Sequence, residues 1–193
     1  MTIGVLALQG SFAEHVDAVR RLGAEPREVR LPAHLEGIDG LIVPGGESTA
    51  IGKLLVLASL LEPLRAAIDA GMPVYGTCAG MILLARDIGG LDQPLLGVMD
   101  IKVRRNAFGR QLESFEENLQ IPHLGAEPFH GIFIRAPLIE ETGPGVITLA
   151  QLPDGRVVAA RQGGLLVSAF HPELTGDLRM HRFFQALIEE RAS

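Results

Sequence analysis

Residues 73–85, PVYGTCAGMILLA, carry the pattern on which the predicted fold rests. A short apolar run leads into Gly76-Thr77-Cys78-Ala79-Gly80, and a second apolar run with the character of a helix follows. The form G-x-C-x-G between a strand and a helix is that of a nucleophile elbow, a sharp turn that lifts a reactive side chain above a sheet. This stretch alone leaves two interpretations open, because a lone cysteine at a strand end also serves as a small buried apolar residue.

An elbow at this position suits a thiol nucleophile. Glycines on either side of Cys78 leave room for so tight a turn. The following helix would direct its positive N-terminal end at the sulfur, which favours the thiolate. Backbone N–H groups at the same helix start are candidates for an oxyanion hole.

The first half of the chain alternates predicted strands and helices. Its strands are continuously apolar, as expected for strands covered on both faces. The predicted strands are residues 2–8, 26–31, 73–77 and the first part of 39–49. The predicted helices are residues 13–24, 49–71 and 79–90. We expect Ser11 to cap the first helix and Pro63 to break the second. This order predicts an α/β fold with three layers, a mostly parallel central sheet and flanking helices.

The second half changes to shorter runs with alternation and turn signals. Asp154-Gly155 in LPDGR is a hairpin signal. These runs predict antiparallel strands, either added to the main sheet or forming a small sheet beside it. Residues 176–193 predict a closing amphipathic helix. Because no linker or repeat interrupts the pattern, we expect a single domain over 1–193.

Composition excludes several classes of protein. The 193 residues are 47% hydrophobic and 21% charged, with a formal net charge of −6. An acidic chain without Lys/Arg runs is not expected to bind nucleic acid. No apolar stretch is long enough for a membrane span, and the apolar start lacks the basic region of a signal peptide. A single cysteine cannot form an internal disulfide. These features together predict a cytoplasmic protein.

A base for the thiol is predicted late in the chain. His171 follows an apolar strand-like run in LLVSAFHPEL, and Glu173 comes two residues later. A histidine there can accept the thiol proton, and a carboxylate on its other ring nitrogen can fix its tautomer. Each residue alone also fits a role without chemistry, as a loop histidine and a surface acid. Together with the elbow they favour a Cys-His-Glu triad.

A Gly-Gly turn in VPGGEST, residues 43–49, is a second candidate element of the site. It would present bare N–H groups at a strand end and form part of an oxyanion hole. The alternative is an ordinary turn with Ser48 or Thr49 as a helix cap. The spacing of a phosphate-binding loop is absent, and no histidine, cysteine and carboxylate cluster has metal-ligand spacing. We therefore expect neither a metal nor a cofactor.

These motifs resemble those of the class I, or triad, glutamine amidotransferases. Within that class LQGSFAEH, PGGEST, GTCAGMILLA, RRNAFGRQLESFE, FIRAP and SAFHPEL are similar to the glutaminase subunits of pyridoxal 5'-phosphate synthase. The resemblance covers nearly the whole chain, and RNAFGRQ followed by SFE is its most specific part. It implies a flavodoxin-like fold and hydrolysis of L-glutamine to L-glutamate and ammonia.

The resemblance also implies roles for individual residues. Cys78 would be the nucleophile, His171 the general acid and base, and Glu173 its orienting partner. The implied substrate-binding residues are Gly46, Glu47, Ser48, Arg105, Ile134 and Arg135. The oxyanion hole would use backbone N–H groups of Gly46 and Ala79, and Gln9 and Gly10 would belong to an activation loop.

The implied partner is a (β/α)8 synthase subunit, assembled as a double-hexamer ring, that receives the ammonia. It builds the vitamin B6 cofactor from ribose 5-phosphate and glyceraldehyde 3-phosphate, and docking on it would complete the oxyanion hole. Three alternatives remain at this point: the glutaminase of another synthase, a stand-alone cysteine hydrolase, and a catalytically silent regulatory subunit. The RNAFGRQ and LQG motifs disfavour the first, HPE and PGGEST the second, and the intact Cys78, His171 and Glu173 the third.

Overall fold

The structure is a computed structural model that describes residues 1–107 and 114–192. The second part of the RNAFGRQ motif, residues 108–111, lies outside the described residues. The helices are α1 (Phe12–Arg21), α2 (Ser48–Leu57), α3 (Leu61–Asp69), α4 (Ala79–Leu84) and α5 (Arg179–Ala192), with short 3-10 turns η1 (Pro32–Leu35), η2 (Pro122–Leu124) and η3 (Pro172–Leu174). The strands of the first half are β1 (Thr2–Leu6), β2 (Glu25–Val29), β3 (Gly40–Val43), β4 (Val74–Thr77) and β5 (Ala85–Asp87). Those of the second half are β6 (Met99–Arg104), β7 (Ser114–Leu119), β8 (Phe129–Ile134), β9 (Leu138–Thr142), β10 (Ile147–Gln151), β11 (Val157–Gln162) and β12 (Leu165–Ser168).

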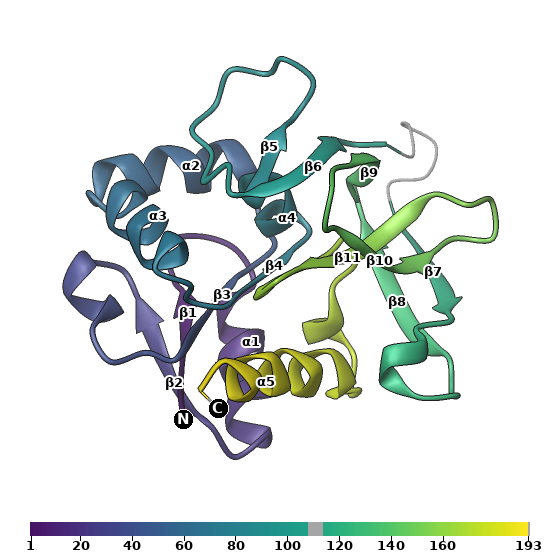
Figure 1. Ribbon diagram of the computed structural model, residues 1–193, viewed down its shortest axis with the longest axis horizontal. Coiled ribbons are helices and arrows are strands. Elements are labelled where there is room, and N and C mark those ends of the chain that lie inside the picture. The colour runs from purple at the N-terminus through teal and green to yellow at the C-terminus, as the bar shows by residue number, and fades with distance from the viewer. Residues whose placement is uncertain (108–113, 193) are drawn as a thin grey trace.

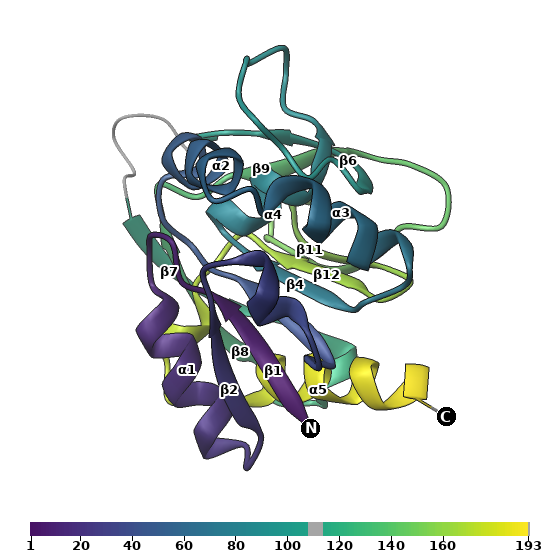
Figure 2. The same ribbon diagram turned by 90° about the vertical axis from the view of Figure 1, so that its left-hand side faces the viewer.

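Within these described residues, one sheet runs in the order β2-β1-β3-β4-β12-β11-β9-β6-β5, with β10 attached to β11. The five strands from β2 to β12 are parallel, and β11, β9 and β10 join in antiparallel pairs. Helices α2, α3 and α4 lie on one face of the sheet, and α1 and α5 lie on the other (Figures 1 and 2). The predicted α/β fold with a mostly parallel sheet is therefore confirmed.

Both predicted arrangements of the second-half strands occur. Strands β6, β9, β10 and β11 extend the main sheet, whereas β7 pairs with β8 in a separate antiparallel ribbon. The Asp154-Gly155 turn joins β10 to β11, as the hairpin signal predicted. None of the helices in the described ranges is long and apolar enough to cross a membrane.

Three local predictions differ from the structure. The helix expected over 79–90 ends at Leu84, because the chain then extends into β5 and pairs with β6. The break between α2 and α3 falls at Ser59, which has a positive φ of 55°, and Pro63 lies in the first turn of α3, where a missing N–H costs nothing. Ser11 precedes α1 but makes no side-chain cap; its hydroxyl has another partner, described below.

The buried aromatic rings beneath the ribbon β7–β8 connect it to the main sheet. Phe129 and Phe133 on β8 pack against Phe170, with ring centroids 5.5 and 5.6 Å apart. All three rings are fully buried. The backbone N–H of His171 donates to the carbonyl of Ile132 at 2.8 Å. Through this packing the end of β8 lies beside the loop after β12.

Candidate active site

Cys78 lies on a strained turn between β4 and α4. Its φ of 48° and ψ of −102° fall in a region that non-glycine residues rarely adopt. The turn is held because the Cys78 N–H donates to the Ser168 carbonyl at 2.8 Å and the Cys78 carbonyl accepts from Met81 at 3.1 Å. The thiol is 7% exposed and donates weakly to the Ile134 carbonyl at 3.8 Å. This geometry is that of a nucleophile elbow.

The two glycines of the G-x-C-x-G motif are sterically required. A Cβ atom on Gly76 would lie 2.7 Å from the backbone of Gly80, and a Cβ on Gly80 would overlap the Val43 carbonyl. Helix α4 can thus pack directly on β3 and β4, and it begins at the residue after the cysteine. As the first residue of that helix, Ala79 has a backbone N–H without an intrahelical acceptor.

His171 and Glu173 lie next to the elbow, on the chain segment that leaves the neighbouring parallel strand β12. The imidazole lines the same pocket as the thiol of Cys78, and its Nδ1 lies 2.7 Å from Oε1 of Glu173. All three residues are buried. The carboxyl ends of parallel strands are where open α/β sheets place their ligand sites, and the structure brings the three predicted residues together there.

The electrostatics of this group favour charged forms. Burial alone would lower the pKa of His171, but hydrogen bonds and charge interactions with Cys78 and Glu173 outweigh it and raise the pKa to about 10. Burial would raise the pKa of Glu173, but His15, His171 and a hydrogen bond from Ser11 together lower it to about 2. The arrangement therefore suits an imidazolium of His171 paired with a carboxylate of Glu173.

Ser11 donates its hydroxyl to Oε1 of Glu173 at 2.6 Å. The same oxygen accepts from His171, so two donors converge on it. This long-range contact is the reason that the Ser11 side chain does not cap α1. The residue preceding the first helix thereby becomes part of the site.

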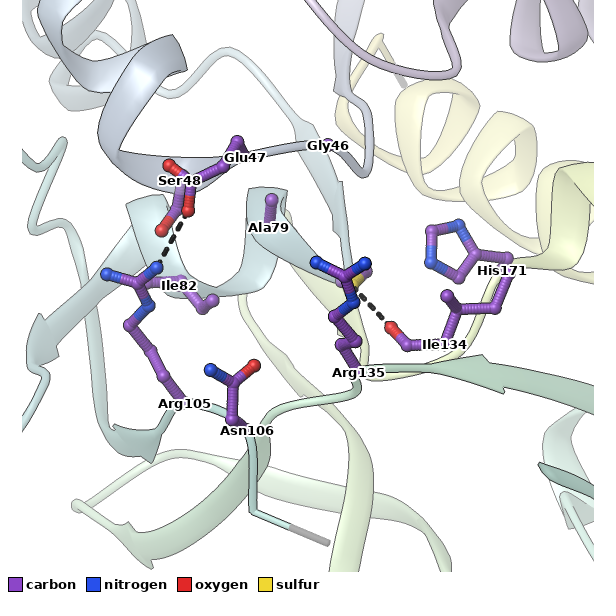
Figure 3. A pocket seen from close by; sticks show the side chains of 11 residues that line it. Gly46, Glu47, Ser48, Ala79, Ile82, Arg105, Asn106, Ile134, Arg135 and His171 are labelled. Atoms are coloured by element: carbon purple, nitrogen blue, oxygen red, sulfur yellow. Dashed lines mark hydrogen bonds and ion pairs between the residues drawn. The ribbon is translucent and has the colours of Figure 1, made fainter. Parts of the chain in front are cut away.

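A pocket of about 290 Å³ opens beside Cys78 and His171 (Figure 3). Its other lining residues are Gly46, Glu47, Ser48, Ala79, Ile82, Arg105, Asn106, Ile134 and Arg135. All of the predicted substrate-binding residues thus line one cavity, at the lower end of the size range of small-molecule sites. Ile82 and Asn106 were not singled out from the sequence.

Arg105 lies at the end of the pocket away from His171 (Figure 3) and holds a polar cluster together. Its guanidinium donates to Oε1 of Glu47 at 2.8 Å and to Oε1 of Gln93 at 3.0 Å. The other carboxylate oxygen of Glu47 accepts from the backbone N–H groups of Thr49 and Ala50 and caps α2. Glu47 is therefore the helix cap, instead of Ser48 or Thr49 as the sequence alternative held.

Gln93 is a residue that sequence reasoning missed. Its Oε1 accepts from Arg105, from Ser48 at 3.3 Å and from Thr49 at 3.1 Å, while its buried Nε2 has no partner in the described part of the chain. No local pattern marks Gln93, which lies in an irregular segment between β5 and β6.

Arg135 differs from Arg105 in having donors that no described residue uses. Among residues 1–107 and 114–192 it makes no hydrogen bond or ion pair, although it lines the pocket and follows β8 directly. Its φ of 43° turns the chain sharply after Ile134. A guanidinium with unused donors beside a nucleophile is suited to a carboxylate of a ligand.

Gln9 and Gly10 lie against the Gly-Gly turn. The Glu47 N–H donates to Oε1 of Gln9 at 2.8 Å, and the Ser11 N–H donates to the Gly45 carbonyl at 3.0 Å. Gly10 has a φ of 101°, and a Cβ there would overlap the same Gly45 carbonyl. The loop after β1 is thereby joined to the loop after β3 at the edge of the pocket.

The site as a whole is equipped for attack on a carbonyl carbon by a thiolate. It offers a nucleophile, an adjacent acid and base with its orienting carboxylate, and two arginine side chains that line the cavity. In the described ranges no three His, Cys, Asp or Glu side chains are grouped so that they could hold a metal ion.

Comparison with known proteins gives consistent matches over nearly the whole chain. The model of the SNO glutamine amidotransferase family matches residues 5–190. Pyridoxal 5'-phosphate synthase subunit PdxT of Herpetosiphon aurantiacus is 60% identical over 190 residues, which are 97% of this chain and 100% of the relative. The protein of the same name from Moorella thermoacetica is 59% identical over 188 residues, covering 97% and 100%. A crystal structure of a glutamine amidotransferase superposes with a TM-score of 0.92 at 52% identity, covering 97% of this chain and 98% of that one.

Proposed function

Because the chain belongs to the SNO glutamine amidotransferase family, we propose that it is the glutaminase subunit of a pyridoxal 5'-phosphate synthase. It hydrolyses L-glutamine to L-glutamate and ammonia, and the synthase subunit consumes the ammonia. The full-length relatives named as subunits of that synthase support this assignment. The observation that carries it is the buried group of Cys78, His171 and Glu173 at the edge of a pocket lined by Arg135, which has no partner among the described residues.

The reaction begins with attack of the Cys78 thiolate on the side-chain amide carbon of glutamine. The carbonyl oxygen becomes an oxyanion, which the backbone N–H groups of Gly46 and Ala79 stabilise. His171, charged in the resting state, donates its proton to the departing ammonia as the C–N bond breaks. A thioester between Cys78 and the glutamyl group remains.

The second step releases glutamate. Neutral His171 accepts a proton from water, the hydroxide adds to the thioester carbon, and the C–S bond breaks to return the thiolate. Glu173 keeps the Nδ1 proton of His171 in place during both steps, so that Nε2 faces the sulfur. One glutamine and one water thus give one glutamate and one ammonia.

Substrate recognition uses the polar side chains that line the rest of the pocket. Arg135 binds the α-carboxylate of glutamine, because its donors have no partner in the described part of the chain, whereas those of Arg105 already serve Glu47, Gln93 and Thr49. Glu47, half exposed, is the acceptor for the α-ammonium group. Arg105 holds Glu47 in position, and Gly46, Ser48 and Ile134 shape the cavity.

We further propose that residues 1–193 form one glutaminase domain that acts in the cytoplasm, where thiols stay reduced. Its partner is a (β/α)8 subunit in a double-hexamer ring. Docking completes the oxyanion hole, and Gln9 and Gly10 belong to the activation loop through which it acts. The contact of Gln9 with the Glu47 N–H supports a link between that loop and the oxyanion turn. The ammonia passes to the synthase by a route shielded from water.

The test is glutamate release from glutamine with and without the cognate synthase, for the wild type, Cys78→Ala and the exposed-loop control Asp92→Ala. We expect hydrolysis that the synthase stimulates, that Cys78→Ala abolishes and that Asp92→Ala retains. Hydrolysis that persists in Cys78→Ala would refute the mechanism. Absence of hydrolysis with an active synthase present would instead support a silent regulatory subunit.

A further inference from the structure

Two buried histidines, neither of which lines the pocket, form a chain of contacts that ends at Glu173. His15 on α1 is fully buried, and His181 on α5 is 1% exposed. Nδ1 of His15 lies 2.9 Å from Nε2 of His181, and Nε2 of His15 lies 3.2 Å from the Thr77 hydroxyl and 3.4 Å from Oε2 of Glu173. Helices α1 and α5 lie on the same face of the sheet (Figures 1 and 2), so this contact joins the first helix to the last.

Both rings are neutral near pH 7. Burial lowers the pKa of His15, with smaller opposing effects of Glu173 and Glu14 and a further lowering by His171. Burial lowers the pKa of His181 to about 3, with contributions from His15, Glu173 and Arg21. A neutral imidazole carries one N–H and one lone pair. The hydrogen bond between the rings therefore has two possible directions.

In the first direction, Nδ1 of His15 donates to His181. Nε2 of His15 then carries a lone pair that faces the ionised carboxylate, which is repulsive. In addition, His181 must carry its proton on Nδ1, a buried atom with no partner in the described part of the chain. A buried donor would be left without an acceptor, at the full cost of its desolvation.

In the second direction, Nε2 of His181 donates to Nδ1 of His15. Nε2 of His15 then carries the proton and directs it toward Oε2 of Glu173 and the Thr77 hydroxyl oxygen. That carboxylate oxygen has no other hydrogen-bond partner among the described residues, whereas Oε1 has two. The second direction replaces the repulsion by an attractive N–H contact with the carboxylate. It also leaves an unpaired lone pair on Nδ1 of His181 in place of an unpaired N–H, which is the rarer defect in protein interiors.

We propose that His15 is a positioning residue for the triad. His181 holds His15 in the tautomer with the proton on Nε2, so that His15 directs an N–H to Glu173. This rests on the proposed function, since Glu173 matters there as the partner of His171. The His15 N–H keeps the Glu173 carboxylate ionised and prevents its rotation away from His171. The imidazolium of His171, and with it the thiolate of Cys78, depends on that carboxylate.

A first experiment reads the tautomers directly. Two-bond ¹H–¹⁵N correlation spectra of the uniformly ¹⁵N-labelled wild-type protein, assigned with His15→Gln and His181→Gln, distinguish a protonated Nδ1 from a protonated Nε2. We expect protonated Nε2 in both rings at pH 7. A proton on Nδ1 of His15 would overturn the proposal. This result does not depend on glutaminase activity, so it stands whether or not the proposed function does.

A second experiment separates the donor from mere packing. His15→Gln keeps an N–H at the reach of Nε2, and His15→Leu fills similar volume without a donor. Cys78 is the only cysteine in the chain, so alkylation by iodoacetamide as a function of pH reports on this thiol alone. We expect the alkylation midpoint of His15→Leu to move to higher pH and that of His15→Gln to stay close to the wild type.

Synthase-stimulated turnover should follow the same order. His15→Leu should lower kcat by about 10-fold to 100-fold with little change in KM. His15→Gln should retain most of the wild-type kcat. Equal losses in both variants, or no loss in either, would contradict a role for the donor. If His15→Leu fails to fold by circular dichroism, the tautomer spectra of the wild type decide. A wild type without turnover would refute the proposed function and leave the spectra and the alkylation profile as the test of His15.

Discussion

Gly45 and His171 lie so close together that a Cβ atom on the glycine would overlap the imidazole Cε1 and come within 3.0 Å of Nδ1. The backbone of Gly45 has no positive φ, so only the space occupied by the histidine requires glycine here. The Gly-Gly turn in residues 43–49 therefore sets the position of the His171 imidazole, in addition to any role of the N–H groups of that turn.

The first prediction concerns this contact. Gly45→Ala should displace the His171 ring and lower kcat about 100-fold, the order expected when a catalytic group shifts by about 1 Å. Gly176→Ala is the matched control, since a Cβ there meets nothing within 4 Å and the glycine has no positive φ. Steady-state glutamate release in the presence of the synthase measures both. If Gly45→Ala were as active as Gly176→Ala, the imidazole would not be confined by this turn.

The second prediction concerns Ser11. Ser11→Ala removes a donor from the buried Glu173 carboxylate, and a hydrogen bond to a charged group contributes about 1.5–3 kcal/mol. We expect kcat to fall by about 10-fold or more, with KM for glutamine nearly constant. Ser11→Thr retains the hydroxyl and should be close to the wild type. Identical kinetics of the two variants would show that the hydroxyl does not support the carboxylate.

The third prediction concerns Gln93. Gln93→Leu removes the acceptor that holds Arg105, Ser48 and Thr49, so the wall of the pocket loses its common anchor. We expect KM for glutamine to rise several-fold with a smaller change in kcat, because the triad is untouched. Asp92→Ala, an exposed neighbour on the same segment, is the control in the same assay. A loss confined to kcat would place Gln93 in the chemistry instead of in recognition.

The fourth prediction concerns acid stability. The pKa of His181 is about 3 in the folded protein and 6.5 in the unfolded chain, so between these values the unfolded chain binds a proton that the folded protein does not. The free energy of unfolding should therefore fall as the pH drops from 6.5 toward 3, by up to about 1.4 kcal/mol per pH unit. His181→Gln lacks this proton and should show a shallower fall.

Urea unfolding at pH 7, 6, 5 and 4 measures the effect for the wild type, His181→Gln and the exposed His123→Gln. As the pH falls, the free energy of unfolding of the wild type should approach that of His181→Gln but not that of His123→Gln. The reason is that His181→Gln lacks the histidine whose protonation favours the unfolded chain. Glu173 contributes in a lower range, since its depressed pKa of about 2 places its loss below pH 4.5. Parallel curves for all three proteins would mean that His181 is protonated in the folded state.

The residues that could be found from the sequence are those with a local pattern. The elbow around Cys78 is readable because glycine spacing, strand and helix are contiguous, and His171 and Glu173 are two residues apart at a strand end. The parallel order of the sheet follows from alternating buried strands and helices. In each case the physical cause lies in a local motif or in the order of consecutive elements along the chain.

The residues that could not be found depend on contacts between distant segments. Ser11 fits a helix cap locally, yet a carboxylate 162 residues away is its partner. His15 and His181 resemble any other histidine on a helix until the two helices pack together. The early end of α4 has the same origin, because pairing of β5 with β6 overrides the apolar helical run.

The separation of these partners along the chain has a consequence for biosynthesis. The nucleophile and its strained turn emerge from the ribosome well before His171 and Glu173, and the contacts of Ser11 with Glu173 and of His15 with His181 span 162 and 166 residues. At a translation rate of about 5–20 residues per second, a nascent chain carries an unpaired thiol for seconds. Contacts between residues so far apart in the sequence form late in folding. The reactive ion pair therefore forms only once both ends of the polypeptide have docked, which ties the onset of chemistry to completion of the fold.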